Sequence, residues 1–152
     1  MKNTLLFAFI LISSFLFGQE IVKKDGFFVN QQGEKHTGEL AAYFENGQKE
    51  FVYEIKEGKE SGEALFYYST GVLMEQGEYH DGVKTGKWIK WNEKGKILAI
   101  ANYNKGEKNG EWVVWDENGV KRYEMTYTNG RRTGIWIGRD EKGEVISKKE
   151  YK

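Results

Sequence analysis

The stretch GKWIKWNEKGK at residues 86–96 returns as GEWVVWDENGV at residues 110–120, displaced by 24 residues. The same displacement relates 14 of the 19 glycines, which fall on three phases of one period. These glycines are Gly38, Gly62, Gly86, Gly110 and Gly134; Gly47, Gly71, Gly95, Gly119 and Gly143; and Gly58, Gly82, Gly106 and Gly130. A period of this length, kept without insertions, indicates an array of one repeated supersecondary unit.

Each unit has room for two short strands and two turns. The first strand carries an aromatic or aliphatic residue at its third position and ends before a turn such as Asn118-Gly119. Asn-Gly between apolar runs favours a two-residue type I′ hairpin loop. The same turn is expected at Asn46-Gly47, Thr70-Gly71, Lys94-Gly95 and Lys142-Gly143. A wider glycine turn, such as NKGEKNG at residues 104–110, follows the second strand.

Two turns in every 24 residues leave no room for a helix, so consecutive strands must be antiparallel neighbours. The sequence therefore predicts an all-β protein, an elongated single-layer antiparallel meander of about five 24-residue β-hairpin repeats. We expect the units at residues 38–61, 62–85, 86–109, 110–133 and 134–152, preceded by a degenerate half repeat at residues 19–37.

The turns also predict which side chains share a face. A two-residue loop at Lys94-Gly95 pairs Glu93 with Lys96, Trp91 with Leu98, and Trp88 with Ala101. Across the wider turns, Tyr79 then falls near Trp88, Tyr103 near Trp112, and Tyr127 near Trp136. The opposite face carries Ile89, Trp91, Val113 and Trp115 beside Arg122 and Glu124. A slip of one residue in a turn would exchange these partners.

The six aromatic residues of one face, Tyr79, Trp88, Tyr103, Trp112, Tyr127 and Trp136, form a predicted ladder of rings. Such a ladder suits flat sugar faces, peptides or the apolar strip of a partner, and we take it as the candidate binding face. The alternative is that the rings only cover one another, because a single-layer sheet has no second layer to form a core.

The N-terminus has the pattern of an export signal. Lys2 gives a positive start, residues 5–17 form an apolar run broken only by two serines, and Gly18 offers a small residue for cleavage. The run is too short to span a bilayer comfortably. We expect residues 1–18 to be a signal peptide and the mature protein to be periplasmic or secreted, with Leu16 leaving the exact cleavage site open.

Composition excludes several functional classes. The chain has 23 basic and 23 acidic residues, and this neutral balance gives no electrostatic attraction to nucleic acid or to an anionic membrane. The absence of cysteine excludes disulfides, thiolate metal sites and thiol catalysis.

The remaining candidates for chemistry do not form a recognisable site. His36 and His80 occupy non-equivalent repeats and have no third histidine or cysteine to complete a metal site. None of Ser61, Ser69 and Ser147 stands in a glycine-flanked nucleophile elbow. Glutamates recur along an open sheet, whereas a catalytic acid pair requires an enclosed cleft. We therefore expect no enzyme activity and no cofactor.

The order of glycine, tryptophan or tyrosine, asparagine-glycine, tyrosine and a second glycine turn resembles the MORN repeat, in its bacterial variant form. The resemblance covers Gly26 to Lys152 and is strongest from Gly62 to Tyr151. It implies an elongated, twisted antiparallel sheet of stacked hairpins. In the family such arrays serve protein contact, phospholipid head-group binding or spacing beside a catalytic domain, and bacterial chains of this kind are often grouped with YwqK-like antitoxins. Because this chain resembles the repeat array alone, without a catalytic domain, the resemblance implies no catalytic residue here.

These observations predict an exported, non-enzymatic interaction module whose partner is another protein. One alternative is a toxin-neutralising protein that occludes its toxin, although an export signal is unexpected in a protein that guards a cytosolic target. The other alternative is peripheral binding to phospholipid or envelope polysaccharide through the ladder.

Overall fold

The computed structural model describes residues 20–152, so the expected signal peptide lies outside the described residues. Every regular element in this range is a β-strand. In chain order the strands are β1 (Val22–Lys24), β2 (Phe27–Val29), β3 (Gly38–Tyr43), β4 (Lys49–Lys56), β5 (Lys59–Tyr67), β6 (Leu73–His80), β7 (Val83–Trp91), β8 (Ile97–Asn104), β9 (Glu107–Lys108), β10 (Gly110–Trp115), β11 (Lys121–Thr128), β12 (Arg131–Arg139) and β13 (Val145–Tyr151).

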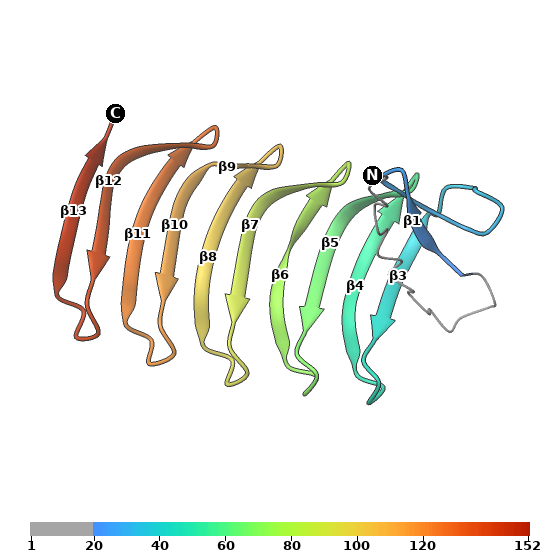
Figure 1. Ribbon diagram of the computed structural model, residues 1–152, viewed down its shortest axis with the longest axis horizontal. Helices are drawn as coiled ribbons and strands as arrows, with labels where there is room; N and C mark the ends of the chain where they lie inside the picture. Colours follow the sequence, from blue (N-terminus) through green and yellow to red (C-terminus); the bar gives the residue numbers. More distant parts are fainter. Residues whose placement is uncertain (1–19) are drawn as a thin grey trace, which may run out of the picture.

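Strands β3 to β13 form one eleven-stranded antiparallel sheet in which each strand pairs with its neighbour in the chain. The short β9 lies off this path. It pairs with one end of β8, and β10 pairs with the same edge of β8 further along. The sheet is a single open layer that extends along the molecule, and its successive hairpins lie side by side (Figure 1). The predicted all-β meander of hairpin repeats is therefore confirmed.

The turns that follow the first strand of each unit differ from the prediction. At residues 92–96 the Asn92 N–H donates to the Lys96 carbonyl and the Gly95 N–H donates to the Asn92 carbonyl, both at 2.9 Å. Only Gly95 has positive φ, at 74°. This geometry is a three-residue loop, a type I turn followed by a glycine bulge, and the predicted two-residue type I′ loop is wrong.

The longer loop changes part of the predicted register. Trp91 faces Ile97, so its predicted pairing with Leu98 is wrong, and Glu93 lies in the loop instead of facing Lys96. A bulge between Lys90 and Trp91 then restores the register. The predicted pair of Trp88 with Ala101 is confirmed for this reason.

The two-residue type I′ loops occur at the other turn of each unit, which the sequence suggested was wider. Lys105 and Gly106 both have positive φ, 49° and 83°, as this turn requires. The widening lies a few residues later, at Gly86 and its equivalents, where φ is positive and the strand bends. The tips of the hairpins accordingly bend away from the long strands, as the upper ends of β7 and β12 show in Figure 1.

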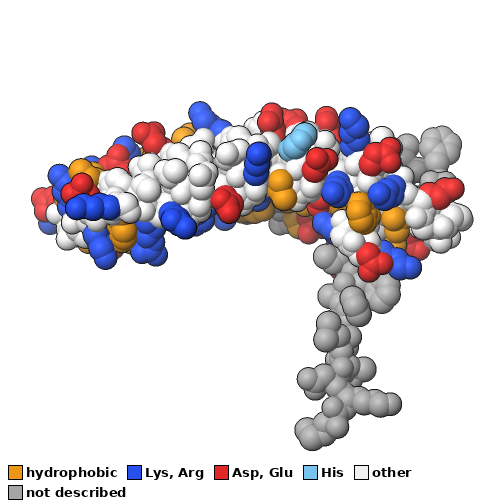
Figure 2. Space-filling view, turned by 90° about the horizontal axis from the view of Figure 1, so that it is seen from above, with side chains coloured by type: hydrophobic (Ala, Val, Ile, Leu, Met, Phe, Trp, Pro, Cys, Tyr) orange, Lys and Arg blue, Asp and Glu red, His pale blue; other side chains and the backbone are white. Residues whose placement is uncertain are grey.

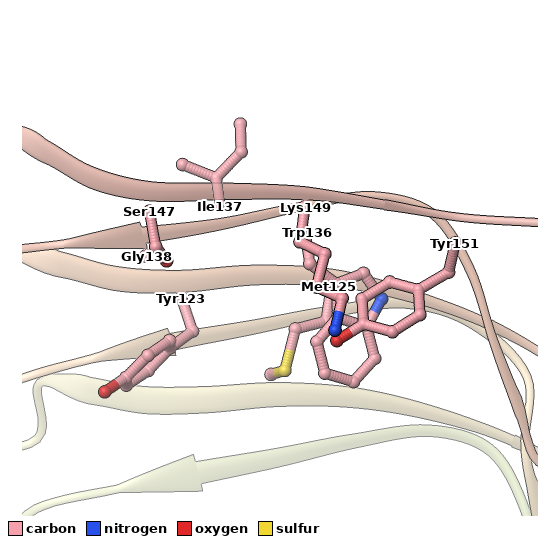
Figure 3. Close-up of a pocket in the computed structure, with 8 residues that line it drawn as sticks. All are labelled: Tyr123, Met125, Trp136, Ile137, Gly138, Ser147, Lys149 and Tyr151. Atoms are coloured by element: carbon pink, nitrogen blue, oxygen red, sulfur yellow. The ribbon is translucent and has the colours of Figure 1, made fainter.

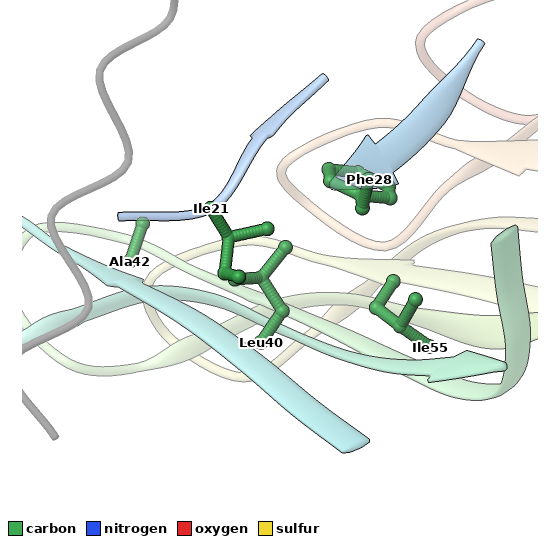
Figure 4. Close-up of a cluster of buried hydrophobic side chains, with 5 residues drawn as sticks. All are labelled: Ile21, Phe28, Leu40, Ala42 and Ile55. Carbon is green, nitrogen blue, oxygen red and sulfur yellow. The ribbon is translucent and has the colours of Figure 1, made fainter. Parts of the chain in front are cut away.

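An N-terminal hairpin closes one end of the array. Strands β1 and β2 form a separate two-stranded sheet, joined to the array where the Phe28 N–H donates to the Gly58 carbonyl at 2.7 Å. The buried cluster at this end consists of Ile21, Phe28, Leu40, Ala42 and Ile55 (Figure 4). The hairpin supplies the apolar cover that a second layer would otherwise give to β3 and β4.

Candidate functional site

The predicted ladder is present, with its rings in continuous contact. Ring centroids are 5.1 Å apart for Tyr79 and Trp88, 5.2 Å for Tyr103 and Trp112, and 5.0 Å for Tyr127 and Trp136. These three pairs are the ones the sequence predicted. The structure extends the row to Tyr53, 6.1 Å from Tyr79, and to Tyr151, 4.9 Å from Trp136. Tyr151 shares the 24-residue phase of Tyr127, so the period already contained the signal for it.

The tryptophans hold the bend of each hairpin. The Trp88 Nε1–H donates to the carbonyls of Glu78 and Thr85, both at 3.2 Å. The equivalent bonds from Trp112 to the Asn102 carbonyl and from Trp136 to the Thr126 carbonyl measure 2.9 and 3.0 Å. Each indole thus binds backbone acceptors where the strand bends, which gives the tryptophans a structural role beyond any contact with a partner.

Among the ladder tryptophans, the first is the most deeply buried. Trp88 is only 2% exposed because it lies over Gly77, where even a Cβ would overlap the indole ring. The equivalent of Gly77 is alanine, then methionine, in the next two units, and both Trp112 and Trp136 are half-buried. A partner could therefore touch Trp112 on β10 and Trp136 on β12, but scarcely Trp88 on β7 or Tyr127 on β11, which is 9% exposed.

A row of cations covers the ladder, and sequence reasoning missed it. Lys84 Nζ lies 3.6 Å from the Trp88 ring centroid, Lys108 Nζ lies 4.2 Å from that of Trp112, and the Arg132 guanidinium carbon lies 4.8 Å from that of Trp136. The three residues recur every 24 positions, a signal that the sequence did contain. Cations over indole faces are attracted to the ring quadrupole. The ladder face is therefore basic around Lys108 and Arg132 although the chain has no net charge, whereas Lys84 is paired with the Glu75 carboxylate at 3.6 Å.

Several ladder tyrosines are shielded from ionisation. Burial, reinforced by neighbouring Tyr103 and by carboxylates, raises the pKa of Tyr79 to about 12. Burial also raises the pKa of Tyr53 and Tyr103. These hydroxyls remain neutral near pH 7 and can only donate or accept hydrogen bonds.

The opposite face of the sheet is apolar along its middle and has no second layer within residues 20–152. Ile89 faces Ile100, which faces Val113, and Val113 faces Glu124. The predicted placement of these residues on one face is confirmed.

Glu124 ends the apolar row with an ion pair, accepting hydrogen bonds from Arg139 at 2.7 Å and Lys121 at 3.1 Å. Those two bonds lower the pKa of its carboxyl. On the side of the hairpin tips, by contrast, charges of both signs are interspersed (Figure 2).

A hollow opens on the ladder face of β11 to β13. It is lined by Tyr123, Met125, Trp136, Ile137, Gly138, Ser147, Lys149 and Tyr151 (Figure 3). Aromatic and apolar groups form most of its surface. Ser147 and Lys149 contribute a hydroxyl and an amine, so the hollow has few polar groups and no nucleophile–base pair.

A metal site, a histidine site and a membrane-spanning helix each require particular features of the described residues. Residues 20–152 contain no group of three or more potential metal ligands placed to share an ion. His36 lies near the Glu39 carbonyl, and His80 pairs with Asp81 at 3.6 Å on an exposed tip. No helix in the described part of the chain has the length and hydropathy needed to cross a bilayer.

The fold and the ladder define the class of protein: an open, single-layer array of β-hairpin repeats. Three successive matches to the model of the MORN repeat variant cover residues 60–81, 84–105 and 108–129, with starting points 24 residues apart. Residues 60–129 of the chain therefore contain three MORN repeats of the variant form. Arrays of this family are generally binding modules. A comparison with curated proteins finds no match for the chain.

Proposed function

We propose that this protein is an exported, non-enzymatic module that binds another protein through the C-terminal half of its ladder face. The observation that supports the proposal is that Trp112 and Trp136 remain partly exposed beside Lys108 and Arg132. Aromatic rings and arginine are the side chains most enriched in the central contacts of protein interfaces. The complementary partner surface is an apolar strip with carboxylates beside it.

The proposal assigns the array no catalytic step, because the ladder face of the described strands presents rings and cations without an adjacent nucleophile and base. Export is proposed from the sequence, in which Lys2 and the apolar run at residues 5–17 precede Gly18. A toxin-neutralising role would use the same surface to occlude a toxin, and a cytosolic location of the mature chain would favour it.

Peripheral binding to anionic phospholipid or acidic polysaccharide is the second candidate function. It is favoured by Lys108 and Arg132, which place one cation on the ladder face in each of two consecutive units, whereas Lys84 in the unit before them is paired with Glu75. Two strand spacings separate these two cations, a distance of about 10 Å. This pair gives a local positive charge that the zero net charge of the chain conceals.

Affinity capture from envelope fractions tests the proposal, with residues 19–152 as bait. The variant Trp112→Ala should lose the partner, while Glu141→Ala, which changes an exposed turn residue, should retain it. Circular dichroism checks that both variants keep the sheet. If Trp112→Ala retains the captured protein as well as Glu141→Ala does, the ladder is not the binding face.

Vesicles distinguish the second candidate function. Retention on vesicles that contain phosphatidylglycerol, but not on vesicles of phosphatidylcholine alone, would support binding to anionic lipid. The variant Lys108→Gln should then weaken retention, and added salt should do the same. Absence of retention at low salt would remove the lipid form of this candidate.

A further inference from the structure

The hollow on the ladder face has a volume of about 420 Å³, which is within the range of pockets for small ligands. Figure 3 shows Tyr123 at one end, and Met125, Trp136 and Tyr151 together at the other. The side chain of Ile137 points away from the other seven residues. The hollow thus lies between Tyr123 and the group of Met125, Trp136 and Tyr151, all on one face of the sheet.

The hollow results from a local departure from the repeat. Gly138 faces Ser147 across β12 and β13, whereas the equivalent pair one unit earlier is Val114 with Tyr123. Glycine and serine therefore replace a branched side chain and a phenol ring, which leaves unfilled space above the strands. A Cβ on Gly138 would lie only 2.6 Å from the Ser147 Oγ, so the two small residues fit each other closely.

The walls suit a ligand with an apolar body. Tyr123 is 51% exposed and packs its ring over no larger residue than Gly138, which it faces across β11 and β12. Trp136 and Met125 are half-buried and offer further apolar surface. An aromatic ring inserted here would lie between the rings of Tyr123 and Trp136, and aromatic rings in contact attract one another.

The charges at the hollow are positive. Lys149 Nζ lies 5.0 Å from the Tyr151 ring centroid, and Arg132 donates a hydrogen bond of 3.3 Å to the Tyr151 hydroxyl. That bond, together with the charge of Lys149, lowers the pKa of Tyr151. The ladder-face positions of the four strands β10 to β13 hold no carboxylate; they include Trp112, Val114, Tyr123, Met125, Tyr127, Arg132, Trp136, Gly138, Ser147, Lys149 and Tyr151.

We propose that this hollow is a binding site for an apolar ring that carries a carboxylate. The ring lies between Tyr123 and Trp136, and the carboxylate pairs with the Lys149 amine. A free aromatic carboxylic acid and the C-terminal residue of a peptide share this chemistry. The site does not depend on the proposed protein partner, because a small acid alone can occupy it.

Binding of N-acetylphenylalanine, compared with its neutral carboxamide, tests the proposal. The indole N–H signal of Trp136, assigned with Trp136→Phe, reports occupancy in two-dimensional NMR spectra of residues 19–152. A ligand of this size should bind with a dissociation constant in the millimolar range. The acid should bind about two- to fivefold more tightly than the amide, the range expected for one partly exposed ion pair.

Three variants locate the site. Ser147→Tyr introduces the residue that the preceding unit uses at this position, so it should fill the hollow and weaken both probes at least tenfold without lowering the thermal midpoint. Lys149→Gln should remove the preference for the acid and leave the amide unaffected. Lys148→Gln is the matched control, because Lys148 faces Ile137 on the other side of the sheet. It should change neither affinity.

A tetrapeptide ending in phenylalanine, with a free or amidated C-terminus, distinguishes the two sources. Tighter binding of the free-acid peptide than of N-acetylphenylalanine supports a peptide terminus as ligand, and equal binding supports a small acid. Equal affinity for acid and amide in the unmodified protein would overturn the proposal. So would unchanged binding to Ser147→Tyr, or equal effects of Lys148→Gln and Lys149→Gln.

Discussion

The contact of Gly77 with Trp88 gives a sharp test of how the repeats pack. Gly77 lies in β6 with an ordinary negative φ, so alanine suits its backbone and would by itself stabilise the chain by about 0.4–1 kcal/mol. The Cβ of Gly77→Ala, however, would overlap the buried Trp88 indole. Overpacking of this kind costs about 1–3 kcal/mol. Taking the middle of each range, we therefore expect Gly77→Ala to destabilise the protein by about 1.3 kcal/mol, which corresponds to a decrease of about 3–5 °C in the midpoint of thermal unfolding.

A double-mutant cycle identifies the cause. Leu40 occupies the Trp88 phase in the first unit, so Trp88→Leu places a residue there that the array already uses. Trp88→Leu alone should destabilise through lost packing and lost hydrogen bonds. In its presence Gly77→Ala should become neutral or stabilising, because the overlapping ring is gone. Additive free energies of unfolding, or a Gly77→Ala variant as stable as the parent, would show that this contact does not limit packing.

Three further predictions concern other parts of the chain. Deletion of Gly86–Asn109, one full repeat, should leave a soluble, shorter sheet in which Tyr79 meets Trp112. Deletion of Gly86–Ile97, half a repeat, should cause aggregation. Similar solubility and thermal unfolding of the two variants would contradict the 24-residue unit. The carboxyl of Glu124 has a lowered folded pKa, so its contribution to stability should be present above about pH 4.3 and decline as the pH falls through the folded value. Chemical unfolding of Glu124→Gln should show a smaller loss over that range, and an identical pH profile would exclude this role. N-terminal sequencing of exported protein should begin at or near Gln19, and an uncleaved cytosolic chain would refute the export proposal.

The turns show where prediction from the sequence failed and what could have corrected it. Both turns of each unit end in glycine, so composition alone did not separate them. Asn92, Asp116 and Asp140 share one phase, and the Oδ1 of each accepts backbone N–H bonds within its own turn, as Asn92 does from Lys94 and Lys96. Asparagine and aspartate favour the first position of a type I turn, so this phase carried the missing signal.

The sequence by itself determined the architecture of the array. Its 24-residue period, kept without insertions, makes every unit place the same residues at the same points of a hairpin. Strand alternation then puts Trp112 and Tyr127 on one face of the sheet, and it does the same for the residues at the equivalent positions of the other units. Period and alternation are local properties, so the meander and the ladder could be predicted without knowledge of distant contacts.

Only the tertiary structure decided which rings are buried and where the hollow lies. Those properties depend on the fit between neighbouring strands, such as Gly77 beneath Trp88 or Gly138 facing Ser147. They also depend on the bend at Gly86, which carries Lys84 over the ladder. Burial and cavity volume arise from side chains of several strands at once, and a repeat period fixes the positions of those side chains without fixing how closely they fit.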